Sequence, residues 1–192
     1  MRAVVLNGAR EGEGRLDQIA DLLRAELESG GWAADVLTLR AITVAPCAGC
    51  FACWVKTPGE CVMPDGNRAI TAATIASDLS ILLTPVVFGG YSSELKKVID
   101  HQIVLVSPFF MRIDGEVHHQ PRYAHYPSLL AIGVQRAHDE AAARLFARHV
   151  ACHGRNLHAP RTHSMIWQAD TPDAALAQQA RQALKIFEEV PT

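Results

Sequence analysis

The sequence predicts an α/β fold built on a doubly wound, five-stranded parallel sheet. Five short apolar segments alternate along the 192 residues with segments whose apolar residues recur at helical spacing. This alternation favours a parallel sheet, because each right-handed crossover between parallel strands needs a helix to return the chain. Hydrophobic residues make up 49% and charged residues 20% of the chain, which is ordinary for a globular protein. We expect a single domain over residues 1–192, with helices on both faces of the sheet.

The first half of the chain contains two of the expected strands. Residues 2–7 form a short, mainly apolar run that ends at a glycine, as is typical of a strand covered on both faces. Leucine and isoleucine then recur at helical spacing over residues 16–27. Residues 33–39 are the second expected strand. Asp65 is suited to cap a second helix that runs to about residue 75.

The second half contains the other three strands, each followed by a helix. Residues 79–87 give the strongest strand signal, and Ser92 or Ser93 is suited to cap the helix after it. The remaining expected elements are that helix up to residue 106, a strand at 129–133, a helix at 139–153, a strand at 164–167 and a last helix at 172–189. Two irregular excursions, residues 40–64 and 108–127, interrupt the alternation.

Ligands of such sheets bind outside the carboxyl ends of the strands, where the strand order reverses. For a strand order of 2-1-3-4-5, that point lies between the first and third strands. The loops at residues 7–15 and 84–94 should therefore form the site. In the second loop, Gly89 and Gly90 would let backbone approach a flat ligand, and the following helix terminus offers free N–H groups. An ordinary glycine turn with a capping serine fits the same spacing.

The second loop also resembles a known family. Thr84-Pro-Val-Val-Phe-Gly-Gly-Tyr-Ser92 is similar to the flavin loop of the NADPH-dependent FMN reductase family. The resemblance implies a flavodoxin-like fold, FMN held by loop backbone, and NADH or NADPH as the co-substrate. It also implies a homodimer or homotetramer. The residues that it assigns to FMN in this loop are Thr84, Pro85, Val86, Val87, Phe88, Gly89, Gly90, Tyr91 and Ser92.

The first loop departs from that family, whose members have a Ser- or Thr-rich segment for the FMN phosphate. Here the sequence is Asn7-Gly-Ala-Arg-Glu-Gly-Glu-Gly-Arg15. Its glycines can present N–H groups, and Arg10 or Arg15 can bind a phosphate. Glu11 and Glu13 would repel a phosphate if they pointed inward. Either they face solvent, or FMN binds weakly, or the loop no longer binds phosphate. The predicted flavin-binding residues here are Asn7, Ala9, Arg10, Gly14 and Arg15.

Four of the five cysteines lie within fifteen residues, with the spacing C-x2-C-x2-C-x7-C: Cys47, Cys50, Cys53 and Cys61. Three thiolates at two-residue gaps can surround one face of an iron–sulfur cube, and the fourth can come from farther along. The spacing resembles the compact cysteine motif of iron–sulfur flavoproteins, which implies a 4Fe–4S cluster on these cysteines beside FMN. Free or disulfide-linked thiols and structural zinc are the alternatives.

The second excursion is rich in histidine and aromatic residues. Asp114-Gly115 is a turn signal between residues 111–113 and 116–118, which predicts a small hairpin. His118 and His119, with the arginine and tyrosine that follow, could line the flavin pocket, bind the nicotinamide cofactor or contact a second subunit. Farther along, His149 and His153 lie four residues apart, as on one helix face. Such a pair is more often packed or solvated than bound to a metal.

Charge and hydropathy restrict the class of protein. The formal net charge of −2 gives no basic field for nucleic acid or an anionic membrane, and no apolar run reaches membrane-spanning length. The short apolar start does not resemble a signal peptide, so we expect a cytoplasmic protein. The leading hypothesis is an FMN-dependent NAD(P)H oxidoreductase that passes electrons to a quinone, a flavin or a protein. The alternatives are an iron–sulfur electron carrier and a flavodoxin-like binding module without flavin.

Overall fold

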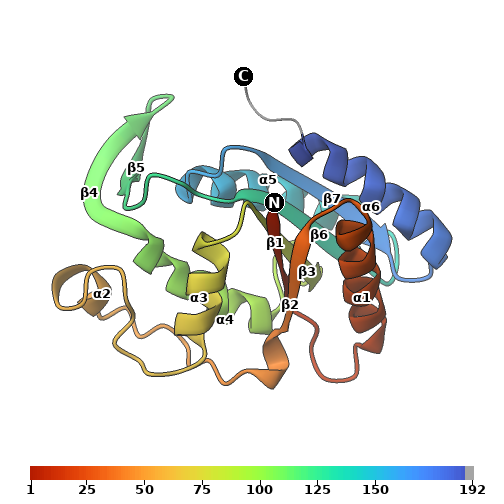
Figure 1. Cartoon of the computed structure of the whole chain (residues 1–192), viewed down its shortest axis with the longest axis horizontal. Coiled ribbons are helices and arrows are strands. Elements are labelled where there is room, and N and C mark those ends of the chain that lie inside the picture. The colour runs from red at the N-terminus through yellow and green to blue at the C-terminus, as the bar shows by residue number, and fades with distance from the viewer. Residues whose placement is uncertain (189–192) are drawn as a thin grey trace.

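The computed structural model describes residues 1–188 and contains the predicted parallel sheet (Figure 1). Its strands are β1 (Arg2–Asn7), β2 (Ala33–Thr38), β3 (Leu79–Pro85), β6 (Ser128–Gln135) and β7 (Thr162–Gln168). Their order is β2-β1-β3-β6-β7, and each neighbouring pair is parallel. This is the order 2-1-3-4-5 in the sequence of the sheet's own strands, so the predicted flavodoxin-like fold is confirmed.

Helices cover both faces of the sheet. They are α1 (Gly14–Ser29), α2 (Ala52–Val55), α3 (Asn67–Ile75), α4 (Ser93–His101), α5 (Glu140–Asn156) and α6 (Asp173–Glu188), with the short 3-10 helices η1 (Leu39–Ala41) and η2 (Gln102–Leu105). Helices α1 and α6 lie on one face, and α3, α4 and α5 pack on the other (Figure 1). The predicted end of the last helix, at Glu189, lies outside the described residues.

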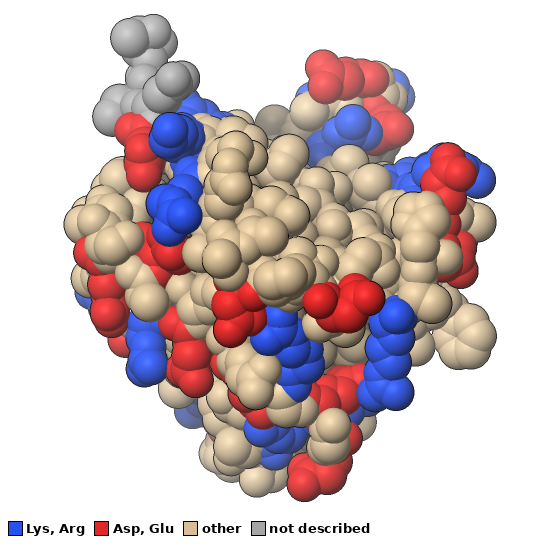
Figure 2. Space-filling view, turned by 90° about the vertical axis from the view of Figure 1, so that its right-hand side faces the viewer, with Lys and Arg blue, Asp and Glu red and all other residues tan. Residues whose placement is uncertain are grey.

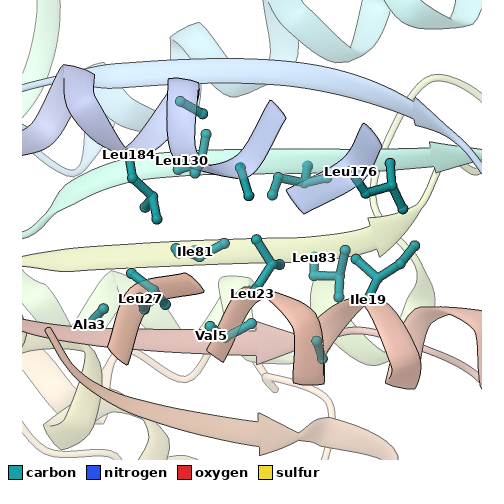
Figure 3. Close-up of a cluster of buried hydrophobic side chains, with 14 of the residues drawn as sticks. Ala3, Val5, Ile19, Leu23, Leu27, Ile81, Leu83, Leu130, Leu176 and Leu184 are labelled. Atoms are coloured by element: carbon teal, nitrogen blue, oxygen red, sulfur yellow. The ribbon is translucent and has the colours of Figure 1, made fainter. Parts of the chain in front are cut away.

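Alternate residues of the strands contact the two helix layers. On one side, the strand residues Val5, Ile81 and Leu83 lie against α1 and α6, as Figure 3 shows. On the other side, Leu6 and Leu82 belong to the core beneath α4 and α5. All five side chains are fully buried, and each contributes roughly 1.5–3 kcal/mol by leaving water. This two-sided core holds the carboxyl ends of the strands, and hence the loops that follow them, in fixed positions.

The second excursion differs from the prediction in one boundary. The helix after β3 ends at His101 rather than at residue 106, and η2 leads into the strand β4 (Val106–Ile113). Pro108 excludes a helix that continues past residue 106, since proline lacks an amide donor and disfavours helical backbone at the residue before it. The predicted hairpin is present: β4 pairs with β5 (Glu116–Pro121) across a turn at residues 114–115. It projects away from the main sheet (Figure 1).

The surface carries charges of both signs. On the face in Figure 2, basic and acidic side chains are interspersed. Elsewhere in the described residues, several charges form exposed pairs at short range, such as Arg24 with Asp21 at 3.0 Å and Arg144 with Glu140 at 2.6 Å. Exposed pairs of this kind stabilise a fold little. Within residues 1–188, no helix has the length and apolarity that crossing a bilayer requires.

Candidate functional site

The two loops predicted to form the site lie side by side at the carboxyl edge of the sheet. They follow β1 and β3, which are adjacent and parallel. The Ser92 hydroxyl donates a hydrogen bond to the Gly8 carbonyl at 2.6 Å, and the Gly8 amide donates to the Leu83 carbonyl at 2.8 Å. A Cβ atom on Gly8 would lie 2.8 Å from Cβ of Leu95. The close approach of the two loops therefore requires glycine at position 8.

The loop after β3 forms a tight turn. Val87 and Gly90 exchange two backbone hydrogen bonds, of 3.1 and 2.9 Å, across Phe88 and Gly89. Both central residues have left-handed backbone, with φ of 49° and 73°. A Cβ on Gly89 would come within 2.7 Å of Cβ of Leu145 in α5, so the turn is packed against that helix. The Phe88 side chain, in contrast, is fully exposed. The turn thus presents an aromatic ring at the rim of the site.

Buried polar contacts fix the base of this loop. The Thr84 hydroxyl accepts a hydrogen bond from the Ser92 amide at 2.9 Å and donates to the Pro85 carbonyl at 3.0 Å. Ser92 also caps α4, because its hydroxyl accepts from the Leu95 amide at 3.2 Å. On the other side, the Val86 amide donates to a carbonyl at the end of β6. The nine predicted flavin-binding residues of this loop, 84–92, therefore run from the last two residues of β3 to the N-cap of α4.

Tyr91 is turned into the core rather than toward a ligand. Its hydroxyl hydrogen-bonds Nδ1 of His153 at 3.0 Å, and Nε2 of His153 lies 3.0 Å from the side-chain oxygen of Gln102. Because that oxygen only accepts, Nε2 carries the proton and Nδ1 accepts from tyrosine. Burial lowers the pKa of His153 to about 4 and raises the pKa of Tyr91. His149 packs edge-on against the tyrosine ring. Of the histidine pair, His153 is therefore packed in the core while His149 is exposed, and Tyr91 offers the site its backbone alone.

In the first loop, one of the two glutamates points inward. The Glu13 carboxylate accepts hydrogen bonds from the amide and the guanidinium of Arg10, both at 2.8 Å, and lies 3.9 Å from the guanidinium of Arg136. Its side chain is only 6% exposed. Burial alone would raise the pKa of Glu13, but the hydrogen bonds and positive charges lower it. Glu11 is exposed. The first of the three alternatives, that both glutamates face solvent, thus holds only for Glu11.

The other predicted residues of the first loop have varied positions. Asn7 and Ala9 are buried, and the Asn7 side-chain oxygen accepts a hydrogen bond from the Ala9 amide at 3.0 Å. Gly14 is exposed and begins α1. The Arg15 guanidinium is turned toward the connection between β7 and α6, where it donates to the carbonyl of Thr171 at 2.7 Å. Of the two predicted phosphate-binding arginines, Arg10 is the one whose side chain lies in the loop.

Sequence reasoning missed Arg136, which directly follows β6. Its guanidinium lies beside Glu13 of the first loop, although the Arg136 side chain is largely exposed. A signal was present, because the carboxyl ends of parallel strands meet at one edge and any polar residue after a central strand belongs to that edge. Loops after β1, β3 and β6 therefore build the candidate site together.

The cysteine segment encloses a separate cavity of ≈ 60 Å³, whose lining includes Cys47, Cys50, Cys53 and Cys61. Sγ of Cys61 lies 3.6 Å from Nδ1 of His101, whose Nε2 donates to the Ala45 carbonyl at 2.8 Å. Burial raises the pKa of Cys53, as do the other three thiols. Within residues 1–188, no group of three or more histidine, cysteine or acidic side chains is arranged to hold a metal ion. The four predicted ligands therefore share a cavity, but they do not form a metal site.

The cysteine cavity and the candidate flavin loops lie at opposite ends of α4. The helix begins at Ser93, next to the loop after β3, and ends at His101 in the cavity lining. Its nine residues span about 13 Å at a rise of 1.5 Å each. Within one chain, the thiols are thus separated from the loops by the length of this helix.

Comparisons with solved structures show the shared fold. The NAD(P)H:quinone oxidoreductase from Methanothermobacter marburgensis matches with a TM-score of 0.72 at 13% identity, over 100% of this chain and 99% of that chain. An NADH:FMN oxidoreductase matches with a TM-score of 0.64 at 14% identity, over 97% of this chain and 87% of that chain. Flavodoxin 1 from Bacillus cereus matches with a TM-score of 0.59 at 10% identity, over the whole of both chains.

Sequence comparisons identify the family. An iron–sulfur flavoprotein from Archaeoglobus fulgidus is 28% identical over 103 residues, which are 54% of this chain and 46% of that protein, so the match spans about half of its length. The model of the NADPH-dependent FMN reductase family matches residues 1–158. This match supports a flavin-dependent oxidoreductase. The chain belongs to the NADPH-dependent FMN reductase family.

Proposed function

We propose that this chain is an NAD(P)H-dependent oxidoreductase that uses FMN and passes electrons to a quinone, a flavin or a protein acceptor. The observation that carries the proposal is the hydrogen bond between Ser92 and Gly8, which joins the loops after β1 and β3 at the switch point of the sheet. This is the place where a doubly wound sheet of this strand order binds FMN. The family match supports the same chemistry.

The chain's own residues would bind and orient the flavin. The bound flavin would supply the redox chemistry, since it accepts a hydride and passes electrons on. The turn at residues 87–90 would contact the flat ring through backbone, and the exposed ring of Phe88 would cover part of it. Ser92 holds the amino terminus of α4 at the loop, where free N–H groups favour the electron-rich edge of the ring. No side-chain acid or base is required.

Anaerobic reduction of the flavin-loaded protein tests this proposal. The purified protein is loaded with FMN and mixed with NADH or NADPH in a stopped-flow spectrometer. We expect loss of the visible flavin absorption with either or both nucleotides, followed by its return when a quinone is added. A protein that takes up no flavin, or whose bound flavin neither nucleotide reduces, would contradict the proposed function.

A second candidate function is that of an iron–sulfur electron carrier. The observation that favours it is the convergence of four thiols on one cavity. A cluster would require these thiols to move into a ligating arrangement, because the described residues do not form a metal site. Anaerobic reconstitution followed by iron and sulfide analysis tests this candidate. Cys61→Ala should lower the bound iron, whereas the exposed Cys152→Ala should not. Absence of iron and sulfide leaves only thiols.

We also propose that the chain forms a homodimer or homotetramer through the projecting hairpin. Phe109, Phe110 and Val117 are apolar side chains of this hairpin and are 67%, 64% and 59% exposed. Exposed apolar clusters of this kind favour a protein partner. Light scattering should give a mass of two or four chains for the natural protein and a smaller mass for Phe109→Ser combined with Phe110→Ser. A natural protein with the mass of one chain would contradict this proposal.

A further inference from the structure

Three successive amides of the first loop are bonded within the protein. After β1, the Gly8 amide donates to the Leu83 carbonyl, the Ala9 amide to the side chain of Asn7, and the Arg10 amide to the carboxylate of Glu13, at 2.8, 3.0 and 2.8 Å. Phosphate sites at the first strand-to-helix turn are built from such amides. These three consecutive N–H groups are therefore not available to a phosphate.

The side chains of the loop that could bind a phosphate are also missing or occupied. Residues 7–16 contain no serine or threonine. The Arg10 guanidinium is bound to Oε1 of Glu13 at 2.8 Å, so the loop already contains an anion paired with its arginine. That carboxylate is nearly buried, and neighbouring positive charges lower its pKa. The side chains of the first loop consequently leave neither of its arginines free for the phosphate group of FMN, since Arg15 is bound to the Thr171 carbonyl.

Backbone contacts keep the Glu13 carboxylate in this position. The Glu13 amide donates to the Arg10 carbonyl at 3.2 Å, and the Glu13 carbonyl accepts from the Leu16 amide at 3.0 Å. The residue is the N-cap of α1, so its main chain is held by the start of the helix. A phosphate that took Arg10 would leave a buried carboxylate without its main partner, which is unfavourable.

We propose that Glu13 is the internal occupant of the anion position in this flavin site, so that the site binds the ring and ribityl chain of a flavin without gain from a 5′-phosphate. The inference rests on the proposed function, because it assumes a flavin at the joined loops. Its preferred ligand class is a flavin with an uncharged terminal group, for which riboflavin is the probe. FMN binds no more tightly than riboflavin, and the identity of residue 13 sets the ratio of the two dissociation constants.

Fluorescence-quenching titrations with riboflavin and FMN test the inference by binding alone. The flavin-free natural protein is compared with Glu13→Gln and Glu13→Ser, and with Glu11→Gln as the matched control on the exposed neighbour. We expect the natural protein to bind riboflavin at least as tightly as FMN. Both Glu13 variants should bind FMN at least about tenfold more tightly, because Arg10 becomes free for a charge-assisted bond. Their riboflavin affinity, and both affinities of Glu11→Gln, should stay within about twofold.

Two results would overturn the inference. One is a natural protein that binds FMN more than about tenfold more tightly than riboflavin, which is the margin that a charge-assisted phosphate contact would give. The other is a pair of folded Glu13 variants, as judged by circular dichroism, whose preference between the two flavins does not change. Absence of binding of both flavins to every variant would overturn the proposed function and this inference with it.

Discussion

Both the backbone conformation of Gly89 and a neighbouring side chain leave no room for a Cβ atom at this position. Its φ is 73°, and a Cβ would lie 2.7 Å from Cβ of Leu145. Gly12 has a similar φ of 77° with nothing within 4 Å, so Gly12→Ala measures the backbone effect alone. We expect Gly12→Ala to lower the free energy of unfolding by about 1–2 kcal/mol and Gly89→Ala by about 1–3 kcal/mol more. Urea denaturation measures both, and equal losses would contradict the packing of the turn on α5.

His153 should make the fold sensitive to acid. Its pKa in the folded chain is about 4, because of burial, whereas an unfolded chain titrates it near 6.5. Below about pH 6.5 the unfolded state therefore binds more protons, so stability is fully present above that pH and falls as the pH approaches 4. His153→Gln should flatten the decline of the melting temperature over this window, and the exposed His138→Gln should not. Parallel declines in all three proteins would exclude His153 as the cause.

At the residue scale, the sequence predicted which residues belong to the first loop better than where their side chains point. It identified both loop arginines and both glutamates. It could not show that Arg15 reaches across to the connection before α6, or that Glu13 is buried. Those directions depend on neighbours distant in sequence, such as Arg136, and no local pattern contains them.

At the element scale, α4 depends on a serine with two roles. The Ser92 hydroxyl caps α4 and also donates to the Gly8 carbonyl. Asp139 caps α5 in the same manner at 2.9 Å but is exposed. We expect Asp139→Ala to lower the free energy of unfolding by about 1 kcal/mol. Ser92→Ala should lower it by about 1–3 kcal/mol more, because the buried Gly8 carbonyl loses its donor.

The two capping residues should also differ in their effect on flavin affinity. Ser92→Ala should weaken riboflavin binding, since it loosens the contact between the two loops, whereas Asp139→Ala should leave binding unchanged. Thermal unfolding and fluorescence titration of the same samples provide both quantities. Equal effects of the two substitutions on affinity would mean that the contact between Ser92 and Gly8 does not organise the site.

Strands and helices could be predicted from the sequence wherever a single local pattern dominated. Apolar runs located all five strands of the sheet, most clearly β1, β3 and β6, because strands buried on both faces carry no polar alternation. The turn at residues 114–115 located the hairpin. The end of the helix after β3 was missed, since residues 103–106 continue an apolar helical pattern while Pro108 and the pairing with β5 favour a strand. That outcome depends on tertiary pairing.

For the whole molecule, the fold places two chemically distinct sites at the two ends of α4. The strand order could be inferred from the resemblance, and with it the location of the flavin loops. The location of the thiol cavity could not be inferred, because residues 40–64 form an irregular segment whose position is set by contacts with α4 and η2. If the flavin site is independent of the thiol cavity, substitutions at the cavity should leave flavin binding intact.

Equilibrium binding of riboflavin to two matched variants tests the placement of the flavin most directly. Gly90 has only an ordinary 3.6 Å neighbour for a Cβ, so Gly90→Leu should fold and place its side chain at the turn. Ala48→Leu adds the same side chain at the exposed rim of the thiol cavity. We expect Gly90→Leu to abolish riboflavin binding and Ala48→Leu to bind as the natural protein does. Retained binding in a folded Gly90→Leu protein, or its loss in Ala48→Leu, would contradict a flavin at the carboxyl edge of the sheet.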